Sequence, residues 1–275
     1  MKYLVILLGL VAAFEYDESL AHQLTAFSFG AYCDINDLIN WNAGQISEQY
    51  PHLTNVQVFE NNEMKTRGYI AYNSMTQAIT VVFRGSENIK NFIADIDTKK
   101  TEFNSVCKCQ VHEGFLAAYK SLKIYLDDLF AGYRVKYPYA KFHVTGHSLG
   151  GAMATLFASE LSMTGLKVIL VTVGSPRVGD SNFYDWFSKL KVTHTRLTNK
   201  KDIAPHLPPF RFSFEHVNTE VWYYDGINYI ICQEVKGEDQ SCSVSVTLTN
   251  LNDHHSYLGW SSNSCNSVPV KEILE

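Results

Sequence analysis

The spacing of apolar residues changes several times along the chain, and each spacing predicts a type of element. Between residues 17 and 32 the apolar side chains lie three or four positions apart, which predicts an amphipathic helix over Asp17–Tyr32. They are Leu20, Leu24, Phe27 and Ala31. The same spacing runs from Gly114 to Tyr137, and Pro138 follows where this second helix should end.

Short apolar and β-branched segments predict the strands. Thr66–Asn73 and Gln77–Phe83 flank a three-residue turn and indicate a hairpin. Further along, strand and helix segments alternate. The expected strands are Lys141–Thr145, Lys167–Val173 and Val192–Leu197, and the expected helices between them are Gly151–Ala158 and Asp180–Leu190. This alternation predicts an α/β fold with a mostly parallel central sheet, helices on both faces and antiparallel pairing at one side.

The first residues have the three parts of a secretory signal. Lys2 precedes an apolar run over residues 3–10, and small residues follow at 11–13. The run is too short to span a bilayer, so we expect cleavage near Ala13 and one domain over residues 14–275. No later run reaches the length of a transmembrane helix. The formal net charge of −5 argues against a nucleic-acid partner.

Six cysteines follow this segment, and an even number in a secreted chain predicts disulfides. They are Cys33, Cys107, Cys109, Cys232, Cys242 and Cys265. The sequence alone allows about 15 pairings. Metal binding is the rival interpretation of the Cys107–Cys109 segment, but no second Cys or His pair has the spacing of a zinc site. We therefore expect neither a metal nor a cofactor.

Gly146-His147-Ser148-Leu149-Gly150 lies between a predicted strand and a predicted helix. A G-x-S-x-G motif in that context is typical of a nucleophile elbow, whose glycines let the chain turn sharply. The serine then lies at a helix N-terminus, where negative charge is stabilised. The motif predicts Ser148 as a nucleophile.

A serine hydroxyl needs a base, and in this architecture an acid and then a histidine follow the serine along the chain. Asp202 comes soon after the strand expected over residues 192–197, and the carboxyl ends of parallel strands carry active-site groups. The candidate bases that follow the serine are His194, His206, His216, His254 and His255. His254 and His255 are favoured, because they lie in a late segment, 252–257, that is free to fold back over the sheet. The residues by themselves leave the choice between them open.

Together with the elbow, further short motifs resemble the class 3 lipase family, which includes fungal triacylglycerol lipases and feruloyl esterases. They are Val82–Ser86, Val111–Phe115, Val173–Gly179, Asp202–Pro209 and Asp253–Tyr257. The resemblance implies an α/β-hydrolase domain over residues 14–275, with Ser148 as nucleophile, Asp202 as acid and His254 as base. It selects His254 over His255 because the base of this family precedes a tyrosine by three positions, as His254 precedes Tyr257.

The oxyanion of an ester's tetrahedral intermediate needs fixed donors. Elbow geometry supplies the Leu149 N–H as one of them. The resemblance implies Ser86 as the other, through its N–H and its hydroxyl. It also implies that Asp95 holds this serine when a lid over the site is open. The same resemblance implies the disulfides Cys33–Cys265 and Cys232–Cys242, and it leaves Cys107–Cys109 as the third pair.

Residues 88–97 carry one apolar helical stripe, which a short core helix or a mobile lid could equally form. The stripe consists of Ile89, Phe92, Ile93 and Ile96. The resemblance favours the lid, which would shield the site in water and rest on a lipid surface.

A lid of this kind points to acylglycerols, chiefly triacylglycerol, at a lipid–water interface. Together with the signal segment, it predicts a secreted hydrolase, and a monomer is the default expectation. A feruloyl-type carbohydrate esterase and a phospholipase A1 are the alternatives among enzymes. The Cys107-x-Cys109 segment favours the feruloyl esterases, because it resembles a short loop disulfide found in them. A non-catalytic lipid-binding or storage protein is the alternative from another class, because hydrolase folds also serve such roles.

Overall fold

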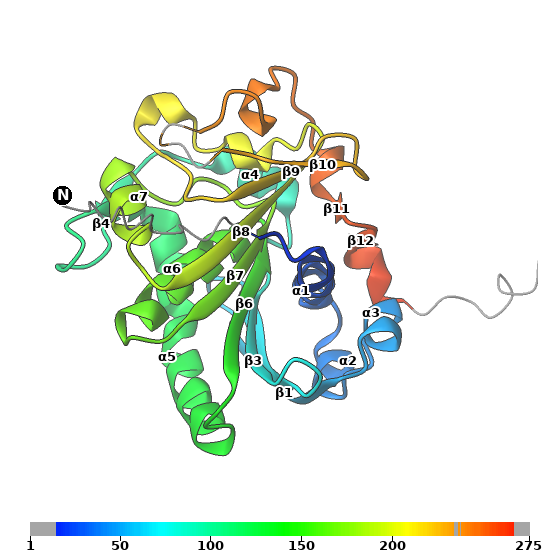
Figure 1. Ribbon diagram of the computed structural model, residues 1–275. Coiled ribbons are helices and arrows are strands. Elements are labelled where there is room, and N and C mark those ends of the chain that lie inside the picture. The colour runs from blue at the N-terminus through cyan, green and yellow to red at the C-terminus, as the bar shows by residue number, and fades with distance from the viewer. Residues whose placement is uncertain (1–14, 234–235, 237, 267–275) are drawn as a thin grey trace, which may run out of the picture.

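The computed structural model describes residues 15–233, 236 and 238–266, so the expected signal segment at residues 1–13 lies outside the described residues (Figure 1). The α-helices are α1 (Glu18–Gly30), α2 (Ile35–Ile39), α3 (Gln45–Gln49), α4 (Ile89–Asp95), α5 (Glu113–Lys136), α6 (Leu149–Met163) and α7 (Ser181–Phe187). The strands are β1 (Leu53–Asn61), β2 (Thr66–Asn73), β3 (Ala78–Phe83), β4 (Lys100–Glu102), β5 (Gln110–His112), β6 (Lys141–His147), β7 (Val168–Val173), β8 (Val192–Asn199), β9 (Glu220–Tyr223), β10 (Tyr229–Ile231), β11 (Ser256–Tyr257) and β12 (Trp260–Ser261).

The main sheet has the strand order β1-β2-β3-β6-β7-β8-β9-β10. Strands β3, β6, β7, β8 and β9 are parallel, which confirms the mostly parallel sheet. Antiparallel pairing occurs at both edges, β1-β2-β3 and β9-β10, and the expectation of one antiparallel side was therefore incomplete. The second antiparallel edge forms because Asp225 accepts backbone hydrogen bonds from Ile227 and Asn228 and closes a tight turn between β9 and β10.

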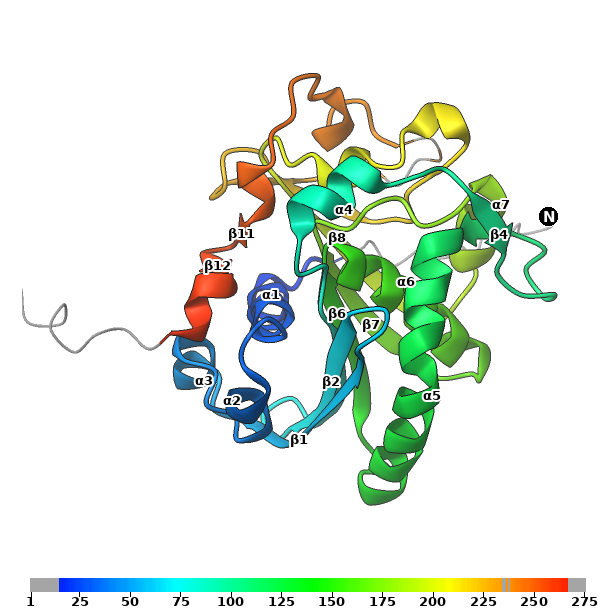
Figure 2. The same cartoon turned by 180° about the vertical axis from the view of Figure 1, so that it is seen from behind.

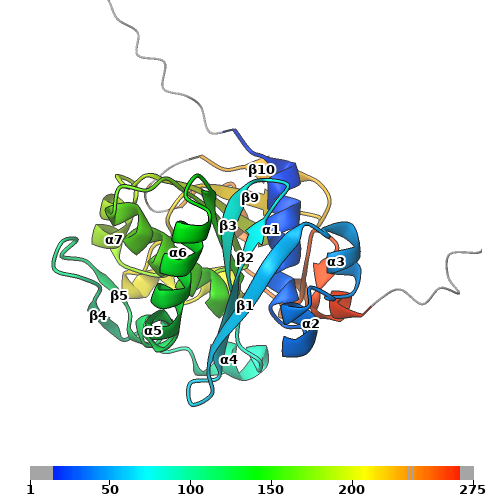
Figure 3. The ribbon, with the colours of Figure 1, turned by 90° about the horizontal axis from the view of Figure 1, so that it is seen from below.

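Helices cover both faces of the sheet. In the view from below, α1 lies on one face, while α5 and α6 lie on the other (Figure 3). Each face has its own apolar core, one with Val144 and Leu170 and the other with Val171 and Val173. Because both faces are buried, the central strands are almost continuously apolar. No helix within the described ranges is long and apolar enough to cross a membrane.

Three disulfides tie distant or irregular segments to this framework. Cys33–Cys265 joins the region after α1 to the end of the described chain, across 232 positions. Cys107–Cys109 lies in the loop between β4 and β5, and Cys232–Cys242 closes a loop after β10. These are the pairs that the family resemblance implies.

A buried ion pair fastens the loop closed by Cys232–Cys242 to the interior. The Arg177 guanidinium donates to both carboxylate oxygens of Glu238, at 2.6 and 2.9 Å, and the two side chains are 3% and 5% exposed. Arg177 also donates to the Pro208 carbonyl at 3.1 Å. The pair therefore connects this loop to the segment that follows Asp202.

This ion pair predicts a loss of stability in acid. Burial alone would raise the pKa of Glu238, but the charges of His216, the paired Arg177 and Arg196 lower it from 4.5 to about 2. The pair therefore contributes its stability above pH 4.5 and loses it as the pH falls towards 2. One pKa unit corresponds to about 1.4 kcal/mol, so the full loss is about 3 kcal/mol, of which about 2 kcal/mol is expected by pH 3. Urea unfolding between pH 7 and 3 should be steeply pH-dependent below 4.5 in the native chain. The free energy of unfolding should depend less on pH in Glu238→Gln. The same pH dependence in the variant and the native chain would contradict the prediction.

Candidate active site

Ser148 lies at the sharp turn between β6 and α6. Its backbone has φ +59° and ψ −129°, a conformation that non-glycine residues rarely adopt. The neighbouring glycines allow the turn. A Cβ at Gly146 would lie 2.3 Å from the Gly150 carbonyl carbon, and one at Gly150 would lie 2.1 Å from the Phe83 oxygen. The turn thus requires glycine on both sides, as the elbow motif predicts.

Asp202 and His254, 52 positions apart, meet in the interior. Asp202 follows β8, and His254 ends the short 3-10 helix η4 (Asn252–His254). His254 Nδ1 lies 2.8 Å from Asp202 Oδ2, and the two side chains are 0% and 1% exposed. Because a carboxylate only accepts, Nδ1 carries the proton and Nε2 is left as an acceptor. Among the described residues, neither His254 Nε2 nor Ser148 Oγ has a hydrogen-bond partner, although both atoms are buried.

Two further donors hold the Asp202 carboxylate. Its Oδ1 accepts from the Ala204 N–H at 2.8 Å, and its Oδ2 accepts from the Tyr257 hydroxyl as well as from His254. Burial, reinforced by the charge of Asp202, raises the pKa of Tyr257 well above its ordinary value, so the hydroxyl stays protonated. Sequence reasoning used Tyr257 only to choose between two histidines, and it did not anticipate this contact.

Tyr257→Phe should lower kcat for ester hydrolysis by about tenfold or somewhat more, because a hydrogen bond to a charged group contributes about 1.5–3 kcal/mol. The matched control is Tyr224→Phe, which changes an exposed tyrosine of the β9–β10 turn. Steady-state kinetics and a thermal melt would be measured on both variants. A kcat for Tyr257→Phe equal to that of the control would show that the hydroxyl does not position Asp202.

Gly174, which follows β7, leaves room for this cluster. It has φ +54°, and a Cβ there would lie 2.9 Å from Asp202 Oδ2 and 3.1 Å from His254 Nδ1. The preceding residue, Val173, accepts a backbone hydrogen bond from Ser148 at 2.9 Å. The ends of β6 and β7 therefore bring the elbow and the Asp202–His254 pair to one place.

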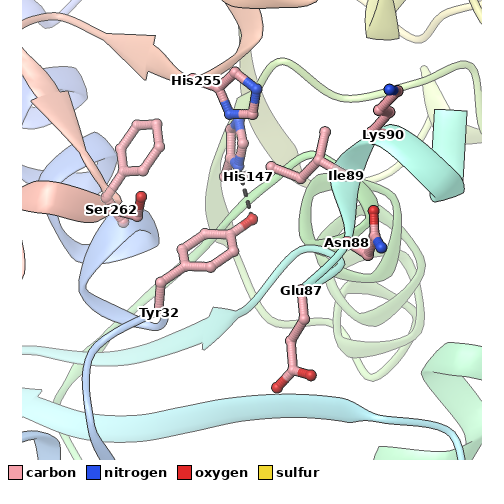
Figure 4. A pocket seen from close by; sticks show the side chains of 9 residues that line it. Tyr32, Glu87, Asn88, Ile89, Lys90, His147, His255 and Ser262 are labelled. Atoms are coloured by element: carbon pink, nitrogen blue, oxygen red, sulfur yellow. Dashed lines mark hydrogen bonds between the residues drawn. The ribbon is translucent and has the colours of Figure 1, made fainter.

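His147, in the elbow, holds the segment that bears His254. Its Nε2 lies 2.9 Å from the His254 carbonyl oxygen, so Nε2 carries the proton and donates. Its Nδ1 therefore accepts from the Tyr32 hydroxyl at 2.8 Å (Figure 4). Burial, with the nearby His254, keeps the pKa of His147 well below its ordinary value, so the ring stays neutral. Nothing in the sequence indicates the Tyr32 contact, which joins residues 115 positions apart.

The two expected oxyanion donors come from neighbouring strand ends. Leu149 is the first residue of α6, where the backbone N–H groups have no partner within the helix. Ser86 follows β3 by way of Gly85, where an added Cβ would lie 3.0 Å from Ser148 Cβ. Arg84 fixes this segment by donating to Glu87 at 2.7 Å and to the Lys65 carbonyl at 2.9 Å. Both donors thus lie on backbone next to the elbow.

Helix α4 lies over the carboxyl ends of the parallel strands (Figure 2). None of its residues is buried, which excludes the interpretation as a core helix. Its apolar stripe is half-buried, while Ser148 and His254 are 0% exposed. A cavity of about 290 Å³, here called the Phe92 pocket, lies between this segment, α5 and the elbow. Its lining includes Phe92, Asp95, Ile96, Phe115, Ala118 and Leu149.

A second cavity, of about 370 Å³, lies beside Tyr32 and is here called the Tyr32 pocket (Figure 4). The end of α1 with the residues just after it, the start of α4, the end of β6 and the C-terminal part of the described chain all contribute to it. Its polar lining residues include Tyr32, Glu87, Asn88, Lys90, His255 and Ser262. Sequence reasoning anticipated neither cavity.

A serine elbow after a central parallel strand, with an Asp–His pair on loops after later strands, is the arrangement of an α/β-hydrolase. A family model described as Lipase (class 3) matches residues 80–212. The solved structure of Rhizomucor miehei triacylglyceride lipase has a TM-score of 0.82 and 32% identity, covering 90% of this chain and 96% of that one. The chain belongs to the class 3 lipase family.

Other relatives agree with this assignment. Lipase II from Rhizopus niveus has a TM-score of 0.81 and 29% identity, covering 91% of this chain and 98% of that structure. In sequence, the Rhizomucor miehei lipase is 34% identical over 216 residues, which is 76% of this chain. The "Secreted mono- and diacylglycerol lipase 1" of Fusarium solani is 35% identical over 158 residues, which is 58% of this chain and 47% of that protein. The chain spans 58–59% of the length of the Rhizomucor miehei and Rhizopus niveus lipases that it matches in sequence.

Proposed function

We propose that this chain is a secreted serine hydrolase of acylglycerol esters, triacylglycerol among them, acting through an acyl-enzyme. The observation that carries the proposal is the buried Asp202–His254 pair, with its unpartnered Nε2, beside the strained elbow at Ser148. Such a site combines a nucleophile, a base and an orienting acid. All three come from one chain, so a monomer suffices. The disulfides favour an oxidising compartment, with residues 1–13 as the signal that directs export.

The chemistry follows from the hydrogen bonds. His254 Nε2 takes the Ser148 proton as Oγ attacks the ester carbonyl carbon, and Asp202 stabilises the imidazolium that forms. The Leu149 N–H and Ser86 donate to the oxyanion. When the intermediate collapses, the leaving alcohol takes the proton from Nε2. Water then attacks the acyl-enzyme by the same route and releases the fatty acid.

We further propose that α4 with Ile96 is a lid. Its apolar stripe has no buried residue, and it borders the Phe92 pocket next to Leu149. In water the lid keeps Ser148 covered. At a lipid surface, displacement of the lid would expose the site and place the stripe of Ile89, Phe92, Ile93 and Ile96 on the lipid. Asp95 would then be available to hold Ser86. The acyl chain would lie along the part of the Phe92 pocket formed by Phe115, Ala118 and Leu149, which remains in place when Phe92, Asp95 and Ile96 move with the lid.

The test is the initial rate of hydrolysis against substrate concentration, from dissolved to emulsified. Tributyrin and triolein would be compared with methyl ferulate and a phosphatidylcholine, using the native chain and Ser148→Ala. The proposal expects a rise in rate where the glyceride forms an interface, absent in Ser148→Ala. Preference for methyl ferulate with simple saturation would replace it with a feruloyl-type esterase, and preference for the phospholipid would replace it with a phospholipase A1. Retained lipid binding without any Ser148-dependent hydrolysis would indicate a binding protein.

A further inference from the structure

A cleft of about 430 Å³, here called the His143 cleft, lies at the opposite end of the sheet from the proposed active site. His143 is near the start of β6, which begins away from α4, whereas Ser148 follows the end of this strand (Figure 2). At about 3.3 Å per residue, the strand separates the two residues by about 16 Å. The volume is typical of small-molecule sites, which measure about 300–1,000 Å³. None of the residues that line the cleft belongs to the proposed active site or lid.

The wall of the His143 cleft is held together by buried hydrogen bonds. The first turns of α1, the β2–β3 turn, the starts of β6 and β7, and Tyr50 form this wall. Gln23 of α1 is 3% exposed and accepts a hydrogen bond from the Asn73 amide at 3.1 Å. The Asn73 carbonyl oxygen of the side chain accepts in turn from the Met75 and Thr76 N–H groups. These bonds fasten α1 to the turn, so the cleft is formed before a ligand binds.

Two polar side-chain atoms at the cleft are buried without a hydrogen-bond partner among the described residues. They are Nδ1 of His143, a residue that is 2% exposed, and Oγ1 of Thr76. A buried polar atom without a partner destabilises a folded chain, and proteins depart from full pairing chiefly at functional sites. A ligand that bonds to both atoms would remove this cost. The two atoms therefore indicate a binding site.

The groups at the cleft favour an uncharged ligand with several hydroxyls. Burial and the nearby Lys141 lower the pKa of His143 to about 4, so its ring is neutral near pH 7. A hydroxyl both donates and accepts, so it can bond to Nδ1 in either tautomer and also to the Thr76 hydroxyl. The lining carries one charge of each sign, on Lys141 and Asp17, and thus offers no net attraction to a cation or an anion.

We propose that the His143 cleft binds a neutral saccharide, which bonds to Nδ1 of His143 and to Oγ1 of Thr76. Leu20, Tyr50 and Ile169 supply carbon-rich surface on which the C–H face of a sugar ring can pack. Further hydrogen-bonding side chains line the cleft, namely Ser19, Gln23 and Gln77. This site goes beyond the proposed ester hydrolysis and does not depend on it.

The experiment follows the imidazole nitrogens of the native chain by NMR, after its histidines have been labelled with ¹⁵N. Glucose, xylose and maltose would each be titrated near pH 7, with glycerol, sodium acetate and ethylammonium chloride as comparison ligands. The resonance that is missing from the spectrum of His143→Phe identifies Nδ1 of His143. We expect this resonance to shift in a saturable way with at least one of the sugars. Neither charged compound should produce a saturable shift.

Thr76→Val and His143→Phe each remove one of the unpartnered groups and nearly keep the shape of the side chain. Each should weaken sugar binding by about two- to tenfold, the effect of one lost hydrogen bond. Isothermal titration calorimetry would measure the affinities, and a thermal melt would verify that each variant is folded. Thr247→Val, which changes an exposed threonine outside the cleft, is the matched control and should leave the affinity unchanged.

Shifts that grow linearly with every sugar would overturn the inference, because they reflect a change of solvent rather than occupancy of a site. Equal affinity in the native chain, Thr76→Val and His143→Phe would also overturn it. Glycerol that binds as tightly as the sugars would exclude recognition of a sugar ring, and tighter binding of acetate or ethylammonium would exclude a neutral ligand. No ester is present in these titrations, so their failure leaves the proposed function intact.

Discussion

Asp202→Asn is expected to lower kcat by about 10⁴-fold while the protein remains folded, as the same change does in comparable triads. In the native chain the carboxylate accepts from Ala204, His254 and Tyr257 at once. An amide keeps the shape of the carboxylate but has no charge, and its NH₂ group donates hydrogen bonds where a carboxylate oxygen accepted them. Either the NH₂ faces the His254 N–H and repels it, or the imidazole takes the other tautomer and offers a proton to Ser148. In the first case the ring loses its orientation and the imidazolium its stabilising charge, and in the second Nε2 already carries a proton and cannot accept the one from Ser148.

The matched control for this variant is Asp253→Asn. Asp253 precedes His254, and its carboxylate accepts from Asn250 and from the Lys201 N–H near the surface. Such a substitution should change kcat by no more than about twofold to threefold. Both variants would be measured by steady-state hydrolysis, with far-ultraviolet circular dichroism to verify folding. If Asp202→Asn retained more than a tenth of the native kcat, the assignment of Asp202 as the orienting acid would be wrong.

Arg177→Ala should destabilise the protein by about 3–5 kcal/mol, because it leaves the Glu238 carboxylate buried and unpaired. The cost includes the hydrogen bond to the Pro208 carbonyl. Arg177 lies just after β7 and Glu238 in the loop after β10, so their separation should loosen the segment next to Asp202 as well. Activity is therefore expected to be lost at a lower temperature than in the native chain.

Urea unfolding at pH 7 measures this effect directly. Lys236→Ala serves as the control, because it removes an exposed ion pair with Asp185 and should leave the unfolding midpoint essentially unchanged. The double variant Arg177→Met with Glu238→Leu should recover much of the stability, because it removes both buried charges together. A native-like midpoint for Arg177→Ala would show that the ion pair contributes nothing.

Where the determinants are local, the sequence predicts the structure well. The elbow is one contiguous segment, and its glycines, its serine and the flanking strand and helix specify each other. Alternating strand and helix segments likewise predict the parallel centre of the sheet. The expected helix over Asp180–Leu190 is shorter in the structure, where α7 begins at an Asp180 cap and ends at Phe187.

Contacts between distant segments could not be predicted in this way. The residues alone leave His254 and His255 equivalent, but the turn of η4 buries His254 and leaves His255 exposed. The bond from Tyr32 to His147 depends on α1 packing against the central strands. Strand β1 was missed because it is an edge strand with a register shift, which interrupts the alternation of buried and exposed side chains along it. These features depend on tertiary packing rather than on local pattern.

The central claim is that Ser148 is the nucleophile of a working site, and covalent labelling tests it most directly. The native chain would be incubated in non-ionic detergent with an alkyl phosphonate ester, which transfers its phosphonyl group to an activated serine and releases the alcohol. Intact-mass and peptide mass spectrometry would then locate the adduct. The account predicts one phosphonyl group per molecule, on Ser148, with none in Ser148→Ala and strongly slowed labelling in Asp202→Asn. An adduct on another serine, or no adduct in native protein that is shown to be folded, would contradict it.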